Sequence, residues 1–235
     1  MSCKFINNFI SFTIKMSSWA QINLLDPINH LQMELKLFHD HGIILRVGII
    51  VLVLIVSTRL IFNRLHTRTV HEAQTLEILW TLFPAVLLIW LALPSLRLLY
   101  LIDEQANSNI VVKALGHQWY WRYELPTVGA SFDSYIVPEN TLKFGEYRLL
   151  EVDKRVLLPY NISSSIITTS SDVIHSWTVP SLGIKIDAVP GRLNIVVTKP
   201  SFPGVLYGQC SEICGANHAF IPIVLETVKA NDLYN

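Results

Sequence analysis

The chain contains 235 residues, of which 51% are hydrophobic and 15% are charged, and its formal net charge is zero. This composition is too apolar and too weakly charged for an ordinary soluble protein of this length. The neutral balance also argues against a nucleic acid as partner, because no surplus of Lys and Arg is available to neutralise phosphates.

Residues 1–39 are expected to form an N-terminal extension and outer segment. The first stretch, MSCKFINNFISFTIK, has lysines, no acids and a short apolar run, which fits either a targeting segment or a start upstream of a working initiator at Met16. We expect a disordered or surface extension here, in which Cys3 has no partner.

Two long apolar runs follow. Residues 42–62 (GIILRVGIIVLVLIVSTRLIF) hold only two arginines as charges, and residues 78–102 (ILWTLFPAVLLIWLALPSLRLLYLI) hold only Arg97. About 20 apolar residues, each rising ~1.5 Å, cross ~30 Å of hydrocarbon. A buried helix of a soluble core is the alternative, but a short chain has little else to bury two of them. We therefore predict a transmembrane hairpin over residues 40–102, with helices at about 40–62 and 77–102.

The segment between the two runs is basic, with Arg59, Arg64 and Arg68 close together. Short loops rich in Lys and Arg stay on the inner side of a membrane. The hairpin loop should therefore lie inside, and residues 103–235 should lie in the outer aqueous compartment.

From residue 103 onward the apolar runs become short and rich in β-branched residues. Examples are NIVVKALG, SIITTSS and RLNIVVTK, which are separated by Pro and Gly turn signals. This pattern predicts an all-β domain built as an antiparallel sandwich or barrel. The domain has more acidic than basic residues, which favours a basic partner.

The stretch GQCSEICGANHAFIP places Cys210, Cys214 and His218 within nine residues. The pair of cysteines could form a disulfide, or the three residues could bind zinc with a fourth ligand. Thiolates with imidazoles also suit copper, and His175 upstream offers a second imidazole. Two thiolates in one loop can then bridge two ions, each holding one imidazole. The residues alone leave copper, zinc and a disulfide open.

Four segments together resemble the cytochrome c oxidase subunit 2 family of the mitochondrial type: GQCSEICGANHAFIPIVLE, DVIHSWTVPSLGIKIDAVPGRLN, GHQWYWRYE and LEILWTLFPAVLLIWLALPSLRLLYLIDE. The likeness extends from about Trp19 to Val228. It implies an α+β membrane protein, in which a two-helix hairpin precedes a cupredoxin-like Greek-key β-sandwich at residues 103–235. It also implies the mitochondrial inner membrane, with the β domain in the intermembrane space.

The resemblance further implies an activity. The chain would accept electrons from cytochrome c at a dinuclear copper A centre and pass them to haem in subunit 1, supporting oxygen reduction and proton pumping. Its partners would be cytochrome c, the lipid bilayer and oxidase subunits 1 and 3. The chain has no haem ligand motif of its own, so it would not reduce oxygen alone.

Site residues are implied position by position. The copper A ligands would be His175, Cys210, Glu212, Cys214 and His218, with Glu212 acting through its backbone carbonyl and its carboxylate helping to hold a magnesium ion shared with subunit 1. The other implied sites are an electron entrance at Trp119 and Tyr120, a proton-channel entrance at Glu77, and acids that dock cytochrome c at Glu124, Asp153 and Asp172. The alternatives are a core aromatic for Trp119, a helix N-terminal acid for Glu77, and solvated surface acids for the rest.

One position departs from the family. The family has a methionine three residues after the second copper histidine, where its thioether is a weak axial ligand, and this chain has Ile221. A real isoleucine should leave the centre able to assemble but shift its reduction potential. A mitochondrial AUA codon translated with the standard table would also print isoleucine for methionine.

Other classes of protein share parts of this pattern. A thioredoxin-like copper chaperone also carries a cysteine pair and a histidine, but it places the cysteines first. A structural zinc protein is a second alternative. Quinol oxidase second subunits lack the copper ligands, and soluble enzymes with a copper A domain lack the hairpin.

Overall fold

The computed structural model describes residues 13–15, 17, 19–65, 71–104, 108 and 110–233. The chain separates into two compact units, one of residues 34–103 and one in which residues up to 33 join residues 104–235. We call them the hairpin unit and the β unit and describe each by itself. Cys3, Met16 and residues 66–70 of the basic loop lie outside the described residues.

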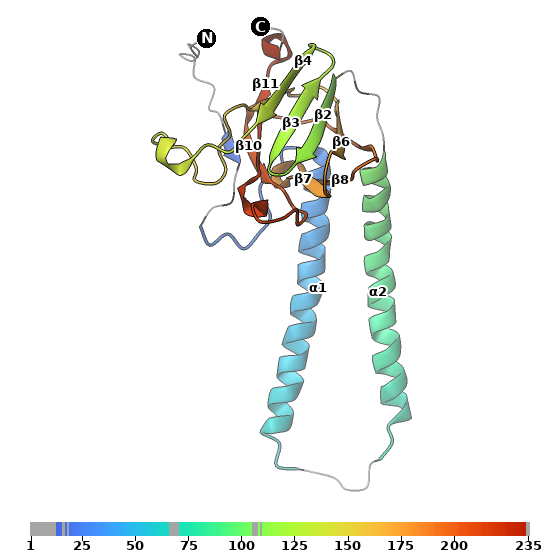
Figure 1. Ribbon diagram of the computed structural model, residues 1–235. Coiled ribbons are helices and arrows are strands. Elements are labelled where there is room, and N and C mark those ends of the chain that lie inside the picture. The colour runs from blue at the N-terminus through green and yellow to red at the C-terminus, as the bar shows by residue number, and fades with distance from the viewer. Residues whose placement is uncertain are drawn as a thin grey trace. The chain divides into compact units, whose positions relative to one another are not determined.

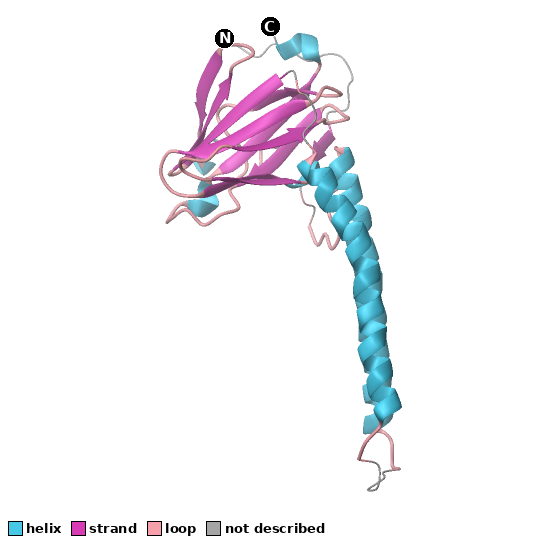
Figure 2. Ribbon diagram, turned by 90° about the vertical axis from the view of Figure 1, so that its right-hand side faces the viewer, coloured by secondary structure: helices cyan, strands magenta, loops and turns pink. Residues whose placement is uncertain are grey.

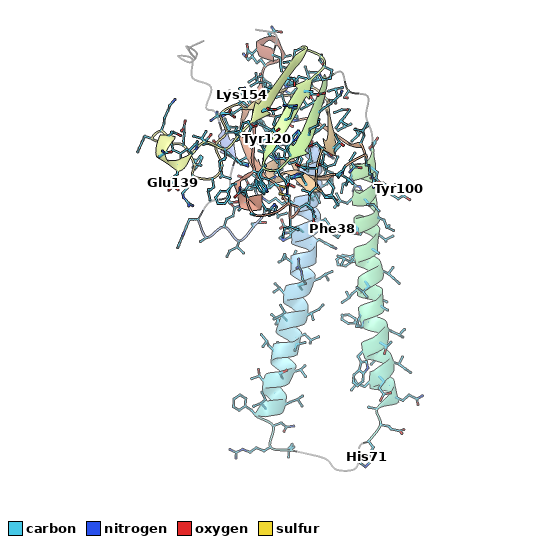
Figure 3. All side chains as sticks on the ribbon, in the orientation of Figure 1. Phe38, His71, Tyr100, Tyr120, Glu139 and Lys154 are labelled. Atoms are coloured by element: carbon cyan, nitrogen blue, oxygen red, sulfur yellow. The ribbon has the colours of Figure 1, made fainter. Side chains whose placement is uncertain are left out.

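The hairpin unit contains most of α1 (His30–Ile61) and all of α2 (Gln74–Asp103), the two long helices in Figure 1. They run antiparallel, because the rings of His41 and Trp90 lie 4.2 Å apart and Arg97 forms an ion pair with Glu34 at 3.6 Å. The most apolar windows have mean hydropathies of 2.4 and 2.1, and none of their residues is buried. Figure 3 shows their side chains projecting outward along both helices. Such apolar surfaces need lipid or partner protein to cover them.

Both helices start earlier than the apolar runs predict. Helix α1 begins at His30 instead of near residue 40, and α2 begins at Gln74 instead of residue 77. Residues 30–39 (HLQMELKLFH) contain strong helix formers such as Leu, Met, Gln, Glu and Lys, so the helix continues beyond its apolar part. Hydrophobicity alone places the start of the predicted helix at residue 40 and leaves residues 30–39 in the extension, because their polar members lower the mean hydropathy.

The β unit contains two main sheets and one two-stranded ribbon, arranged in layers (Figure 2). The first sheet has the order β4 (Ala130–Ser134), β3 (Tyr120–Leu125), β2 (Ile110–His117), β6 (Ser164–Ser170) and β9 (Asn194–Thr198). The second has the order β1 (Thr13–Lys15), β10 (Gly204–Gln209), β11 (Pro222–Val228) and β5 (Val156–Pro159), and the ribbon pairs β7 (His175–Val179) with β8 (Ile184–Ala188). Short 3₁₀ turns are η1 (Glu139–Thr141), η2 (Pro180–Leu182), η3 (His218–Phe220) and η4 (Ala230–Leu233).

The sheets are mixed, whereas the sequence predicted antiparallel pairing. Strand β2 pairs antiparallel with β3 but parallel with β6, and β11 pairs antiparallel with β10 but parallel with β5. Paired strands β2 and β6 are separated in the chain by β3, β4 and β5. Such long returns let neighbouring strands run in the same direction, and composition alone does not reveal them.

The core lies between the layers. Buried residues alternate with partly exposed ones along β2 and β6, as expected for strands with one face inward. The indole N–H of Trp177 donates to the hydroxyl of Tyr123 at 3.2 Å inside this core. The larger buried apolar side chains come from all three groups of strands: Val112, Trp121, Ile166, Val179, Ile184, Leu206, Ile223 and Leu225.

A piece of the expected N-terminal extension belongs to this core. Ile28 is only 2% exposed, its N–H donates to the carbonyl of Ser181 at 3.1 Å, and its carbonyl accepts from Ser201 at 2.9 Å. The neighbouring Asn29 amide donates to the hydroxyl of Thr198 at 3.2 Å. These residues therefore stabilise the β unit, whereas the sequence pattern predicts a disordered or surface extension there.

Candidate metal centre

Two separate segments supply the candidate ligands. His175 is the first residue of β7, and Cys210 directly follows β10. The chain returns to β11 through residues 210–221, and the N–H of Cys210 donates to the carbonyl of Ile221 at 3.0 Å, which closes this ligand loop. The N–H of Ser211 donates to the carbonyl of Ser176 at 3.0 Å, so the loop is fastened beside His175.

The four side-chain donors form a row. His175 Nδ1 lies 3.8 Å from Cys210 Sγ, the two Sγ atoms of Cys210 and Cys214 lie 4.0 Å apart, and Cys214 Sγ lies 3.4 Å from His218 Nδ1. His175 is fully buried and both cysteines are buried. The loop and sheets thus bring together all the side chains that the resemblance named as copper ligands.

The spacing separates the open alternatives. A disulfide requires sulfur atoms about 2.05 Å apart, and both cysteines are free. The ligand atoms of His175, Cys210 and Cys214 lie within 4.8 Å of one another, but His218 is not in that group. Two ligands of one tetrahedral zinc, with bonds of about 2.0–2.3 Å, lie about 3.3–3.8 Å apart. Each imidazole stands beside a different sulfur, so the row suits two bridged ions better than one.

Two further positions complete the loop. The carbonyl of Glu212 lies 3.4 Å from Cys210 Sγ, so a backbone oxygen also faces the donors. Ile221 is 1% exposed and belongs to the same buried cluster as both cysteines. Its hydrocarbon side chain offers no donor atom.

The two thiols ionise differently. Burial opposes ionisation of Cys210, but its interactions with His175 and with backbone N–H groups outweigh burial and lower its pKa to about 7. Burial and then the neighbouring Cys210 charge raise the pKa of Cys214 to about 12. Two thiolates side by side are therefore unfavourable until a cation neutralises them, which is a property of a metal-binding pair.

A carboxylate holds the first imidazole. Asp172 Oδ1 accepts from Nε2 of His175 at 2.9 Å, and the same carboxylate accepts from the N–H groups of Gln118 at 2.7 Å and Val173 at 2.6 Å. Partial burial would raise the pKa of Asp172, but these hydrogen bonds lower it. Asp172 keeps a proton on Nε2, so Nδ1, which faces Cys210, is the nitrogen that can bind a metal once its own proton is lost, as in metal-bound histidines.

A glycine makes room for this imidazole. A Cβ atom on Gly116 would lie 2.7 Å from Cδ2 and 2.9 Å from Cγ of His175. The ring of Trp121 approaches it edge-on, with centroids 5.9 Å apart. The imidazole is therefore fixed by packing as well as by Asp172.

The predicted electron entrance lies against the ligand loop. A Cβ on Gly215, which has a φ of +121°, would lie 3.3 Å from both Nε1 and Cζ2 of Trp119, so the indole packs directly on this glycine, next to Cys214. Tyr120, labelled in Figure 3, stacks on the rings of His117 and Tyr135, and its ring centroid lies 4.6 Å and 4.5 Å from theirs.

The remaining predicted residues are not part of this cluster. Glu124 forms an ion pair with Lys113 at 3.5 Å, and Asp153 is exposed and accepts from the N–H of Tyr135 at 2.7 Å. Glu77 lies in the first turn of α2, in the hairpin unit. Asp172, which the resemblance assigns to a docking surface, is exposed and in addition accepts the hydrogen bond from His175.

The chain matches known proteins over most of its length. The family described as "Cytochrome C oxidase subunit II, transmembrane domain" matches residues 17–98, and "Cytochrome C oxidase subunit II, periplasmic domain" matches residues 110–228. Cytochrome c oxidase subunit 2 of Albinaria caerulea is 59% identical over 92% of this chain and 97% of the relative. The same subunit of Albinaria turrita is 58% identical over 94% of this chain and 99% of the relative.

A solved structure agrees with the fold. The crystal structure of the periplasmic domain of subunit II of cytochrome oxidase from Bradyrhizobium japonicum superposes with a TM-score of 0.51 at 40% identity, over 55% of this chain and 90% of that one. The expected fold class, a membrane hairpin followed by a cupredoxin-like β domain, is confirmed. The alternative of a thioredoxin-like copper chaperone is excluded, because the β unit matches the periplasmic domain of subunit II.

We expect Asp172→Ala to weaken metal binding by roughly 10–100-fold, because His175 would lose the group that fixes its ring and its tautomer. The measurement is metal retained by the full-length protein during titration with a chelator. Asp153→Ala is the matched control, since that exposed carboxylate contacts no ligand residue. Equal retention in the two variants would contradict the role given to Asp172.

Proposed function

This chain belongs to the cytochrome c oxidase subunit II family, and from that membership we propose that its β unit holds a dinuclear copper A centre that takes electrons from cytochrome c. As a subunit of the oxidase, it would pass them to haem in subunit 1. The observation that carries the proposal is the row of His175, Cys210, Cys214 and His218, in which each imidazole stands beside a different sulfur.

The donor set fits copper. Soft thiolates and imidazoles suit copper, and paired sulfurs can bridge two ions. When bound, the copper pair would exchange single electrons with little change in geometry, because two bridged ions share the charge. Burial of His175, Cys210 and Cys214 keeps water from the donors, and the carbonyl of Glu212, 3.4 Å from Cys210 Sγ, would complete the set.

Trp119 is the proposed electron entrance. Its indole is partly buried and packs on Gly215, one residue from Cys214, so the path from the surface to a bridging sulfur is short. Tyr120 and its stacked neighbour Tyr135 lie beside it. Glu124, Asp153 and Asp172 are the proposed acids that attract a basic cytochrome, although Glu124 is also paired with Lys113 and Asp172 also holds His175.

The assembly is proposed from the family. The chain would sit in the mitochondrial inner membrane with subunits 1 and 3, and its β unit would lie in the intermembrane space. Glu77 would stand at the entrance of a proton channel that supports proton pumping. The carboxylate of Glu212 would help to hold magnesium at the border with subunit 1.

We expect Trp119→Phe to slow electron transfer from reduced cytochrome c roughly tenfold or more, which corresponds to about 1.4 kcal/mol of barrier or above. The smaller ring would open a gap on Gly215 and lengthen the electron path. The measurement is the fast phase of cytochrome c oxidation by the assembled oxidase in a stopped-flow instrument.

Trp80→Phe makes the same chemical change on an exposed position of α2 and should leave that rate unaltered. The assignment of Trp119 fails if its variant matches this control. A slow rate explained entirely by weaker binding of cytochrome c would instead make Trp119 a docking residue.

Residue 221 gives a second prediction. With isoleucine there, the axial position has no donor, so the oxidised centre is less stabilised and its reduction potential should lie above that of an Ile221→Met variant. A redox titration of both oxidases followed by copper absorption measures this difference. The mass of the peptide that contains residue 221 must first match isoleucine, and a methionine mass would remove the prediction.

A further inference from the structure

Gln118 lies between β2 and β3, directly before Trp119, and makes two hydrogen bonds to two ligand-bearing segments. Its backbone N–H donates to Asp172 Oδ2 at 2.7 Å. Its side-chain Nε2 donates to the backbone carbonyl of Cys214 at 2.7 Å. The residue thus reaches both sides of the candidate metal centre.

Each of these hydrogen bonds is made to a group that is itself bonded to, or part of, a candidate ligand residue. Asp172 holds Nε2 of His175 through its other oxygen, Oδ1, at 2.9 Å. The carbonyl of Cys214 belongs to the residue whose sulfur lies between Cys210 and His218. A change in the position of Gln118 would therefore be transmitted to an imidazole and to a thiol.

The packing of the ligand loop depends on the same place. A Cβ on Gly215 would lie 3.1 Å from Nε2 of Gln118 and 3.3 Å from two atoms of Trp119. The backbone of the ligand loop at Gly215 therefore packs closely against both the amide of Gln118 and the indole of Trp119. An amide that fixes the carbonyl of Cys214 also fixes the contact between Gly215 and the indole.

Resting on the proposed function, we propose that Gln118 is a positioning residue for the metal centre and for its contact with the electron entrance. Its side-chain amide holds the backbone at Cys214 in position beside Trp119. Its backbone N–H fixes the carboxylate of Asp172, which in turn holds His175. Gln118 is itself exposed, so the alternative is a polar residue that contacts an arriving partner. Its amide, however, is directed to Cys214.

The test uses the assembled oxidase with Gln118→Met, which keeps the length of the side chain and removes the donor. We expect an altered copper absorption and paramagnetic resonance spectrum in the absence of cytochrome c. Losing one hydrogen bond should also lower copper retention against a chelator by roughly two- to tenfold. Gln118→Glu is the second variant, and its carboxylate, facing the carbonyl of Cys214, should produce a larger change.

Arg148→Met is the matched control. It also removes one surface hydrogen bond, from Arg148 to Glu139 at 2.9 Å, on a segment that carries no ligand, and Glu139 is labelled in Figure 3. This variant should have the same copper spectra as the parent and retain the same amount of copper against a chelator.

Three results would overturn the inference. The first is a Gln118→Met oxidase with the spectrum and copper retention of the parent. The second is a change confined to the salt-dependent KM for cytochrome c, which would make Gln118 a docking residue. The third is a parent oxidase with no copper in this chain, which would overturn the proposed function and the inference with it.

Discussion

Two thiols and two imidazoles lie in one row in this protein, and the strands and loops of the β unit hold these four side chains in position. The donors come from the start of β7 and from the loop between β10 and β11, so they meet only when the sandwich is complete. Neighbouring buried thiols resist losing both protons, as the raised pKa of Cys214 indicates. Metal binding and the folded state therefore stabilise each other, because the positive charge of the metal neutralises the two thiolates that burial disfavours.

The surrounding residues hold this row in place by three different means. Backbone hydrogen bonds close the loop at Cys210 and Ile221 and fasten it to β7. Asp172 sets the tautomer of His175 through a charged hydrogen bond, and the missing side chain of Gly116 leaves space for its ring. Gly215 lets the loop lie against Trp119, so the group proposed to receive electrons contacts the residue that follows the ligand Cys214.

Local patterns in the sequence predicted the membrane hairpin, the all-β character of the second unit and the residues that meet at the metal centre. Apolar runs and Cys–His spacing are local, and they can be read without knowing which strands pair. The burial of Ile28, the parallel pairing of β2 with β6 and the use of Asp172 by His175 all depend on contacts between distant segments. An acid before a histidine looks the same in a sequence whether it faces solvent or the ring, so the bond from His175 to Asp172 could not be predicted, and the docking role that the resemblance implies for Asp172 stays a prediction. The early start of α1 at His30 was missed for another reason, since helix propensity continues where hydrophobicity stops.

The most direct test of the central claim is electron paramagnetic resonance of the oxidised, assembled oxidase. If Cys210 and Cys214 bridge two coppers, the unpaired electron will be shared by two equivalent copper nuclei, and the signal will disappear when either cysteine is replaced by serine. A spectrum split by a single copper nucleus, or zinc in place of copper in this chain, would contradict the account.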